Sequence, residues 1–201
     1  MSLHKEIAFE YDIFGLLAKN GWFYFEGDST HYDRQKALFL PDLLAWIETT
    51  QPDSWQRMVK NHGASLHTVL AERVRKNLNE RGTLEVLRRG VQMLGLTKPL
   101  LLVQFKPALA INPTIQQYYA ANRLRVVRQV HHSLNNPNES IDLVFFVNGI
   151  AVATVELKSD FTQSVQDAVD QYRFDRDPAP KGGKVEPAAL VRWVTTLAPS
   201  P

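Results

Sequence analysis

The stretch SIDLVFFVNGIAVATVELKS, Ser140–Ser159, decides the fold of this chain. Two apolar runs flank an Asn-Gly pair, and this pattern predicts a β-hairpin. Both faces of the two predicted strands are largely apolar, so the hairpin is expected to lie inside a sheet. Asp142, Glu156 and Lys158 interrupt it at the end remote from the turn. A buried charge costs several kcal/mol unless it is paired or binds a metal, so these three residues need an explanation.

The register of the hairpin decides whether the three charges lie together. With a two-residue turn, Asp142 would lie opposite Val155, while Glu156 and Lys158 would point to the other face. A three-residue loop or a β-bulge shifts this parity, and Asp142 then shares a face with Glu156 and Lys158. A joint site for the three charges therefore requires an odd loop or a bulge.

Two carboxylates on one face repel each other unless a cation lies between them. Mg²⁺ prefers oxygen ligands, few protein carboxylates and several waters. Asp142 and Glu156 are therefore predicted metal ligands, with the backbone carbonyl of Leu157 as a further one. Lys158 can orient or help deprotonate a metal-bound water and stabilise the pentavalent phosphate of a phosphodiester under attack. An ion pair of Lys158 with either acid at a strand end is the alternative.

The composition is that of an ordinary globular protein. The 201 residues carry a formal net charge of +2 and contain no cysteine, which excludes disulfides and a thiolate zinc site. The mild positive charge permits nucleic-acid binding without requiring it. The first residues lack the apolar core of a signal peptide, and no apolar run approaches the roughly 18 residues of a membrane span. A cytoplasmic protein without membrane contact is expected.

The chain is predicted to be a single domain over 1–201, with a mainly helical part over 1–98 and a sheet core over 99–201. In the first part, helical patterns begin at 5–20, are interrupted at Pro41, and end with a helix that Thr83 can cap. In the second part, predicted strands lie at 98–107, 123–134, 140–158 and 189–197, and predicted helices at 111–123 and 164–178. This alternation predicts an α/β fold with helices on both faces of the sheet.

The opening stretch resembles the nuclease core of the PD-(D/E)xK superfamily and, more narrowly, the N-terminal nuclease domain of type I restriction enzyme R subunits. Other stretches resemble the same family in its order: KNGW, YDRQKALFLPDLLAWIETTQPDSW, RGTLEVLRRGV, ANRLRVVRQV and DAVDQYRFDRDP. The resemblance covers nearly the whole chain. It implies a restriction-endonuclease-like mixed central sheet flanked by helices, with a helical elaboration in the N-terminal half.

The resemblance also implies roles for the charged residues. Asp142 corresponds to the first metal-binding acid, with Ile141 in place of the proline of the superfamily's name. Glu156 corresponds to the second acid and Lys158 to the catalytic lysine. Glu10 lies where related nucleases often carry an additional acid near the metal.

Further residues are implied to contact DNA or couple the domain to a motor. Gln171 and Tyr172 lie near the family's Gln-x-x-x-Tyr element, although here they are adjacent and Asp175 stands four residues beyond Gln171. Arg123 and Arg125 are predicted to share one strand face, where they can track DNA phosphates. A solvated strand edge is the alternative for this arginine pair.

The resemblance implies Mg²⁺-dependent hydrolysis of double-stranded DNA, with Mn²⁺ as a substitute and with 5′-phosphate and 3′-hydroxyl ends. Recognition is expected to be mainly of the DNA backbone. Family R subunits continue into an ATP-driven motor, whereas this sequence contains no G-x-x-x-x-G-K-[ST] phosphate loop. ATP is therefore expected to act only in the full-length enzyme, whose partners are the methyltransferase and specificity subunits.

A catalytically silent module is the rival prediction. Such a module would bind DNA or dock another subunit, and its acids would be structural. The complete Asp, Glu and Lys set argues for the nuclease, because a silent descendant should often have lost one member.

Overall fold

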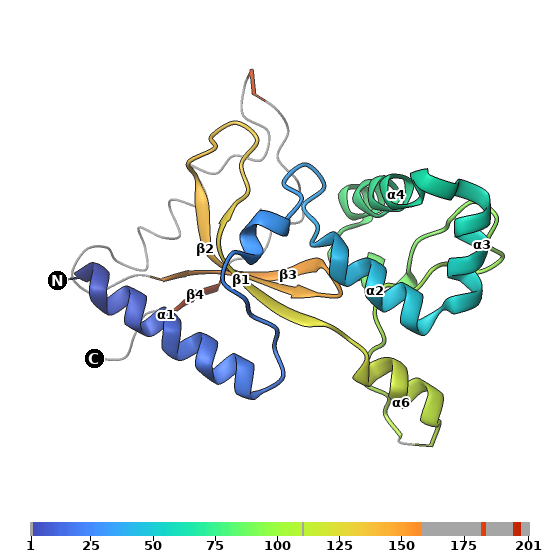
Figure 1. Ribbon diagram of the computed structural model, residues 1–201, viewed down its shortest axis with the longest axis horizontal. Coiled ribbons are helices and arrows are strands. Elements are labelled where there is room, and N and C mark those ends of the chain that lie inside the picture. Colours follow the sequence, from blue (N-terminus) through green and yellow to red (C-terminus); the bar gives the residue numbers. More distant parts are fainter. Residues whose placement is uncertain (1, 110, 158–181, 184–194, 198–201) are drawn as a thin grey trace.

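The predicted hairpin forms the centre of a mixed α/β fold (Figure 1). The computed structural model describes residues 2–109, 111–157, 182–183 and 195–197. Its helices and 3-10 turns are α1 (Ser2–Lys19), η1 (Asp28–His31), α2 (Leu40–Thr50), α3 (Pro52–His62), η2 (Gly63–Ser65), α4 (Leu66–Arg81), α5 (Thr83–Arg89) and α6 (Pro113–Ala120). Its strands are β1 (Leu124–His131), β2 (Ser140–Val147), β3 (Ile150–Leu157) and β4 (Thr195–Leu197).

The sheet has the order β1-β2-β3-β4. β1 pairs with β2, and β2 with β3, in antiparallel fashion, whereas β3 and β4 run parallel. The predicted mixed sheet is therefore confirmed, and the fold is compatible with a restriction-endonuclease-like arrangement. The β2-β3 turn consists of Asn148 and Gly149, both with positive φ (49° and 77°). This conformation matches the right-handed twist of the flanking strands.

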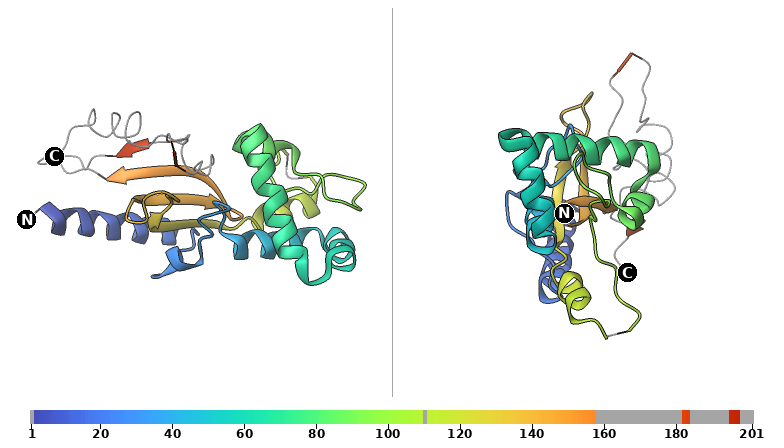
Figure 2. Two further views of the ribbon diagram at one scale, coloured as in Figure 1. Left: turned by 90° about the horizontal axis from the view of Figure 1, so that it is seen from above. Right: turned by 90° about the vertical axis from the view of Figure 1, so that its right-hand side faces the viewer.

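α1 covers one face of the sheet. Phe14 of this helix is buried in a cluster with Val126, Leu143, Val155 and Leu157 from three strands. Seen from above, α1 runs along the sheet, and α2 to α4 lie at the far end of the molecule (Figure 2). The apolar spacing of the first helix, visible in the sequence, is thus explained by its contact with the sheet.

The opposite face of the sheet is covered by the segment between η1 and α2. Tyr32, Ala37 and Phe39 pack there against strand residues that include Val144 and Phe146. The separate core of α2 to α5 reaches the hairpin at Ile150. The N-terminal half thus contributes to both faces of the sheet as well as forming the predicted helical part.

Gly149 lies against the beginning of α2. Its carbonyl accepts a hydrogen bond from the Phe39 N–H at 2.8 Å. A Cβ at this position would lie 2.2 Å from the Phe39 carbonyl oxygen and 3.1 Å from the Leu43 nitrogen, which are both backbone atoms. Only glycine allows this close approach in addition to the positive φ.

The strand predicted over 98–107 is wrong. Apart from an isolated bridge between Val91 and Leu100, this segment has no strand pairing. Side-chain amides bind its backbone instead: Gln51 bonds both the N–H and the carbonyl of Leu101, and Asn148 donates to the Leu102 carbonyl. The apolar run reflects burial among the helices, not a place in the sheet.

Several helix boundaries also differ from the predicted ones. Pro41 lies in the first turn of α2 and does not interrupt a helix, because the first turn needs no N–H from it. The N-cap of α5 is Gly82, so Thr83 is the first helical residue. Asn112 caps α6, accepting bonds from the Thr114 and Ile115 N–H groups. The helix predicted over 164–178 lies outside the described residues.

No helix in the described part of the chain combines the length and the apolar character needed to cross a bilayer.

Candidate functional site

A β-bulge in β3 resolves the question of register. Phe145 pairs with Ala153, whereas Phe146 pairs with Ala151, so Val152 is an extra residue in β3. The turn itself is a two-residue one, and the bulge beyond it supplies the shift of parity that the site requires. Beyond the bulge, Leu143 pairs with Val155. Continuing this register by one residue on each strand brings Asp142 level with Glu156.

Asp142 is held by hydrogen bonds to both carboxylate oxygens. Its Oδ2 accepts a bond from the Leu157 N–H at 2.7 Å, which ties β2 to the end of β3. Its Oδ1 accepts a bond from Gln129 Nε2 at 3.2 Å. The same Gln129 nitrogen lies 3.5 Å from Glu10 Oε1. Glu10 of α1 and Asp142 of β2 thus share one amide donor.

Arg128 holds the other oxygen of Glu10. Its Nη2 lies 3.0 Å from Glu10 Oε2, and its guanidinium carbon lies 5.7 Å from the centre of the Tyr11 ring. Burial alone would lower the pKa of Arg128, but a hydrogen bond with Tyr24 and the charge of Glu10 outweigh it, so the pKa is raised. Arg128 therefore carries a positive charge beside the acids.

Glu156 is buried, with 3% of its surface exposed, and Glu10 is buried to a similar degree at 6%. Asp142 is half-buried. Lys158, Gln171 and Tyr172 lie outside the described residues. The roles predicted for all of these side chains remain predictions.

The described oxygen donors fit Mg²⁺. Each oxygen of Asp142 retains acceptor capacity beyond the hydrogen bond described above, because a carboxylate offers about four lone-pair sites. In the described ranges, no group of three or more His, Cys, Asp or Glu side chains is placed to hold a metal together. Mg²⁺ is commonly held by one or two protein carboxylates with waters completing its shell, so a site on Asp142 and Glu156 would not need a third acid. Asp142, Glu156, the Leu157 carbonyl and Glu10 remain the predicted ligands.

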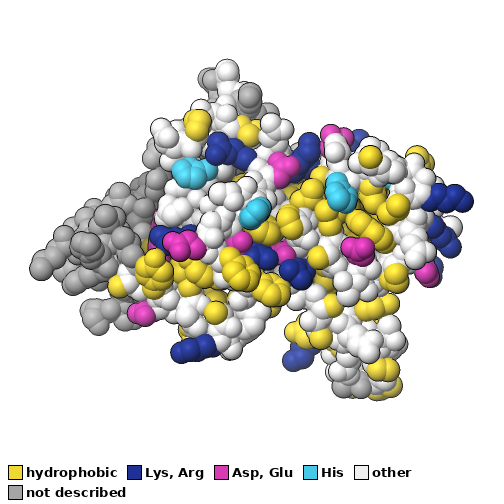
Figure 3. Space-filling view, viewed as in Figure 1, with side chains coloured by type: hydrophobic (Ala, Val, Ile, Leu, Met, Phe, Trp, Pro, Cys, Tyr) yellow, Lys and Arg dark blue, Asp and Glu magenta, His cyan; other side chains and the backbone are white. Residues whose placement is uncertain are grey.

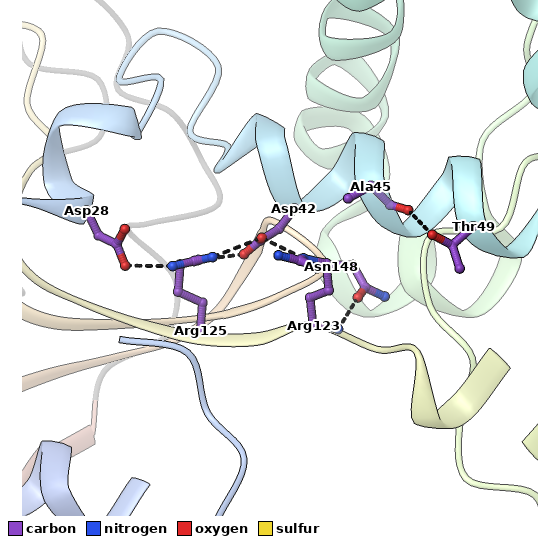
Figure 4. A network of polar contacts seen from close by, with 7 residues as sticks. All are labelled: Asp28, Asp42, Ala45, Thr49, Arg123, Arg125 and Asn148. Carbon is purple, nitrogen blue, oxygen red and sulfur yellow. Dashed lines mark hydrogen bonds and ion pairs between the residues drawn. The ribbon is translucent and has the colours of Figure 1, made fainter. Parts of the chain in front are cut away.

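Arg123 and Arg125 form a second charged cluster (Figure 4). Both point toward α2, as their predicted common face requires. Arg125 binds both oxygens of Asp42, at 2.6 and 3.0 Å, and its Nη1 lies 2.6 Å from Asp28 Oδ2. Arg123 Nε donates to Asp42 Oδ1 at 2.7 Å. The cluster joins β1 to η1 and α2.

Arg125 was predicted to contact DNA phosphates, but its side chain lies in the interior of the protein. Its side chain is only 6% exposed, and its guanidinium carbon lies 4.4 Å from the centre of the Phe39 ring. Burial by itself would lower the pKa of Arg125, but the hydrogen bonds and charges of Asp42 and Asp28 outweigh it and raise the pKa. A guanidinium committed in this way is not available to a DNA phosphate, so we do not retain Arg125 among the proposed DNA contacts. Arg123, with a side chain 34% exposed, remains a predicted one.

The face of the molecule shown in Figure 3 carries Lys and Arg side chains interspersed with Asp and Glu side chains. This mixture agrees with the mild net charge of +2. Sequence reasoning missed the most connected residue of the acid site, Gln129. Glutamine carries no charge that would single it out, and the signal in the structure is its positive φ of 47° within β1.

The structure is thus a mixed α/β domain, compatible with a restriction-endonuclease-like fold. Comparison with known families then identifies it further: the model of the type I restriction enzyme R protein N terminus matches residues 13–187. The chain belongs to this family. Neither the curated proteins nor the solved structures include a match to the chain.

Proposed function

We propose that this domain is the metal-dependent endonuclease part of a type I restriction enzyme R subunit and hydrolyses DNA phosphodiester bonds. The observation that carries the proposal is the bulge at Val152, because the register beyond it, continued one residue past the Leu143–Val155 pair, sets Asp142 opposite Glu156. Without the bulge, the two acids would belong to opposite faces. Membership of the R-subunit family supports the same conclusion.

In the proposed mechanism, Asp142 and Glu156 would hold Mg²⁺, with the Leu157 carbonyl and Glu10 as further ligands. A bound Mg²⁺ would supply Lewis-acid stabilisation of the phosphoryl oxygens and lower the pKa of a bound water. The bond from the Leu157 N–H to Asp142 Oδ2 fixes the orientation of the first acid. Lys158, by its position two residues after Glu156, is proposed to orient the attacking water and to neutralise charge on the phosphate.

In the full-length R subunit, ATP would drive a motor outside this chain, and Gln171 and Tyr172 would help to couple that motor to the nuclease. The proposed partners are double-stranded DNA and, through the whole R subunit, the methyltransferase and specificity subunits in the cytoplasm. Arg123 is the described arginine that we retain as a backbone contact.

Nicking of supercoiled plasmid in Mg²⁺ or Mn²⁺ tests this proposal. The wild-type chain is expected to nick the plasmid, whereas Lys158→Ala and Asp142→Ala are expected not to do so while keeping a folded circular-dichroism spectrum. Nicking by Lys158→Ala at the wild-type rate would refute the assigned site. If the wild type does not nick, Mn²⁺ binding is compared between the wild type and Asp142→Ala. Weaker binding by Asp142→Ala would indicate a metal site that needs the motor, and equal binding would indicate a silent module.

The silent docking module remains the second candidate. Its support is that both oxygens of Asp142 already accept hydrogen bonds from the protein, as a purely structural acid would. On this alternative, Asp142→Ala lowers the free energy of unfolding and DNA binding does not respond to divalent cations.

A further inference from the structure

The acids of the proposed site are connected by one uncharged side chain. Gln129 has two N–H groups on Nε2, which reach Asp142 Oδ1 at 3.2 Å and Glu10 Oε1 at 3.5 Å. Its own Oε1 accepts a hydrogen bond from the Ser140 hydroxyl at 3.0 Å. The two carboxylates fix which end of the amide faces them, because ionised carboxylates only accept hydrogen bonds, whereas a hydroxyl can bond to either end of an amide. We call Glu10, Gln129 and Asp142 the acid bridge.

The backbone of Gln129 is in an unusual conformation that serves the acid bridge. Its φ of 47° is rare for a residue other than glycine, asparagine or aspartate. Arg128 pairs with Leu143 and Val130 with Ile141, so this continuous register sets Gln129 opposite Asp142. Such strained residues persist where surrounding contacts hold them, and they gather at functional sites.

Both oxygens of Glu10 are held by adjacent residues of β1. Gln129 lies at Oε1, and Arg128 lies 3.0 Å from Oε2. Both oxygens of Asp142 are likewise held, one by Gln129 and the other by the Leu157 N–H. A continuous path of polar contacts therefore crosses from α1 through β1 and β2 to β3, and Gln129 links the two acids.

We propose that Gln129 is a positioning residue of the metal site, which orients the carboxylates of Glu10 and Asp142 by donating one N–H to each. The inference rests on the proposed function, because it takes Asp142 as a metal ligand. The amide donates to both carboxylates and so offsets their repulsion before the cation binds. Partners that orient metal ligands in this way commonly change metal affinity by about 10- to 100-fold when they are replaced.

Two substitutions test the role of Gln129 with Mn²⁺ as the probe. Gln129→Asn keeps an amide and tolerates the positive φ, but it is one methylene too short to reach both acids. We expect it to weaken Mn²⁺ binding, measured by electron paramagnetic resonance of the free ion, by about tenfold or more. Gln129→Glu keeps the length and replaces the donor with a third carboxylate, so Mn²⁺ should stabilise this variant against heat more than it stabilises the wild type.

Gln92→Asn is the matched control. Gln92 Nε2 also donates two hydrogen bonds, to the Met93 and Leu96 carbonyls, but it lies in the helical part. It should leave Mn²⁺ affinity unchanged. In a Glu10→Gln background, Gln129→Asn should change Mn²⁺ affinity less than it does in the wild type, because one of the two bridged acids is gone. A purely structural role for Gln129 would leave its effect equal in the two backgrounds.

The outcomes separate this inference from the function on which it rests. If the wild type binds Mn²⁺ and Gln129→Asn binds it equally well, the positioning role is refuted while the nuclease proposal stands. If the wild type and every variant fail to bind Mn²⁺, both proposals fail. Weaker binding by Gln129→Asn with unchanged binding by Gln92→Asn supports the positioning role.

Discussion

Replacing Asp42 by Asn should destabilise the protein more than most single changes. Asp42 is 1% exposed and accepts three hydrogen bonds, one from Arg123 and two from Arg125. Asp42→Asn keeps the shape but removes the charge, so buried Arg125 is left with Asp28 as its remaining acid. Removing one partner of a buried ion pair costs about 3–5 kcal/mol. For a chain of this length, that loss lowers the midpoint of thermal unfolding by roughly 6–20 °C.

Urea unfolding followed by circular dichroism and tryptophan fluorescence measures this change, provided that the two signals report the same transition. Glu80→Gln is the control, because the Glu80–Lys76 pair is exposed and spans 3.8 Å. Exposed pairs contribute about 0–1 kcal/mol, so the control should differ little from the wild type. A loss below about 1 kcal/mol for Asp42→Asn would refute the claim that the cluster is a buried structural network.

Three further predictions concern the turn, the network and the metal. Gly149→Ala should lower the free energy of unfolding in urea by more than about 2 kcal/mol, because it combines a positive φ with a clash against the Phe39 carbonyl. Gly27→Ala should lower it by only about 1–2 kcal/mol, because Gly27 has a φ of 86° but no atom within 4 Å of the added Cβ. A similar cost for both would contradict the role of the clash. The pKa of Arg125 is raised in the folded protein, so its stabilising effect is fully present at any pH below the pKa that the arginine side chain has in the unfolded chain. Arg125→Gln should therefore lower the free energy of unfolding by the same amount at about pH 6 and at about pH 9. An effect that changes between these pH values would count against this reasoning. Saturating Mn²⁺, at roughly 100 times its dissociation constant, should raise the unfolding midpoint of the wild type by about 5–10 °C and leave that of Asp142→Asn nearly unchanged; equal shifts would exclude Asp142 as a ligand.

The hairpin, its apolar faces and the helix α6 could be predicted because their signals are local. An Asn-Gly pair between apolar runs specifies the turn, and Asn112 before Pro113 specifies the start of a helix. The bulge at Val152 has no such signal, because Ala151 and Ala153 flank it and either register buries apolar side chains. The sequence alone therefore did not predict whether Asp142 and Glu156 share one face of the hairpin.

Long-range polar contacts account for the predictions that were wrong or incomplete. The segment 98–107 has the composition of a strand, but Gln51, which lies 50 residues before Leu101 in the sequence, binds its backbone. Arg125 looked like a surface cation, since nothing near it in the sequence reveals that Asp28 and Asp42 fold over it. Partners of this kind are separated by many residues, and local pattern does not predict them.

The turn between β2 and β3 has a consequence for how the protein unfolds. Asn148 is fully buried, and its amide donates to the Leu102 carbonyl and to Asn122, while its side-chain oxygen accepts from the Arg123 N–H. Gly149 binds Phe39 at the start of α2. Opening this turn would therefore release the helical part and the sheet at the same time. Amide hydrogens in α2 and in β2 should then exchange with solvent through a shared opening, as members of one cooperative unit.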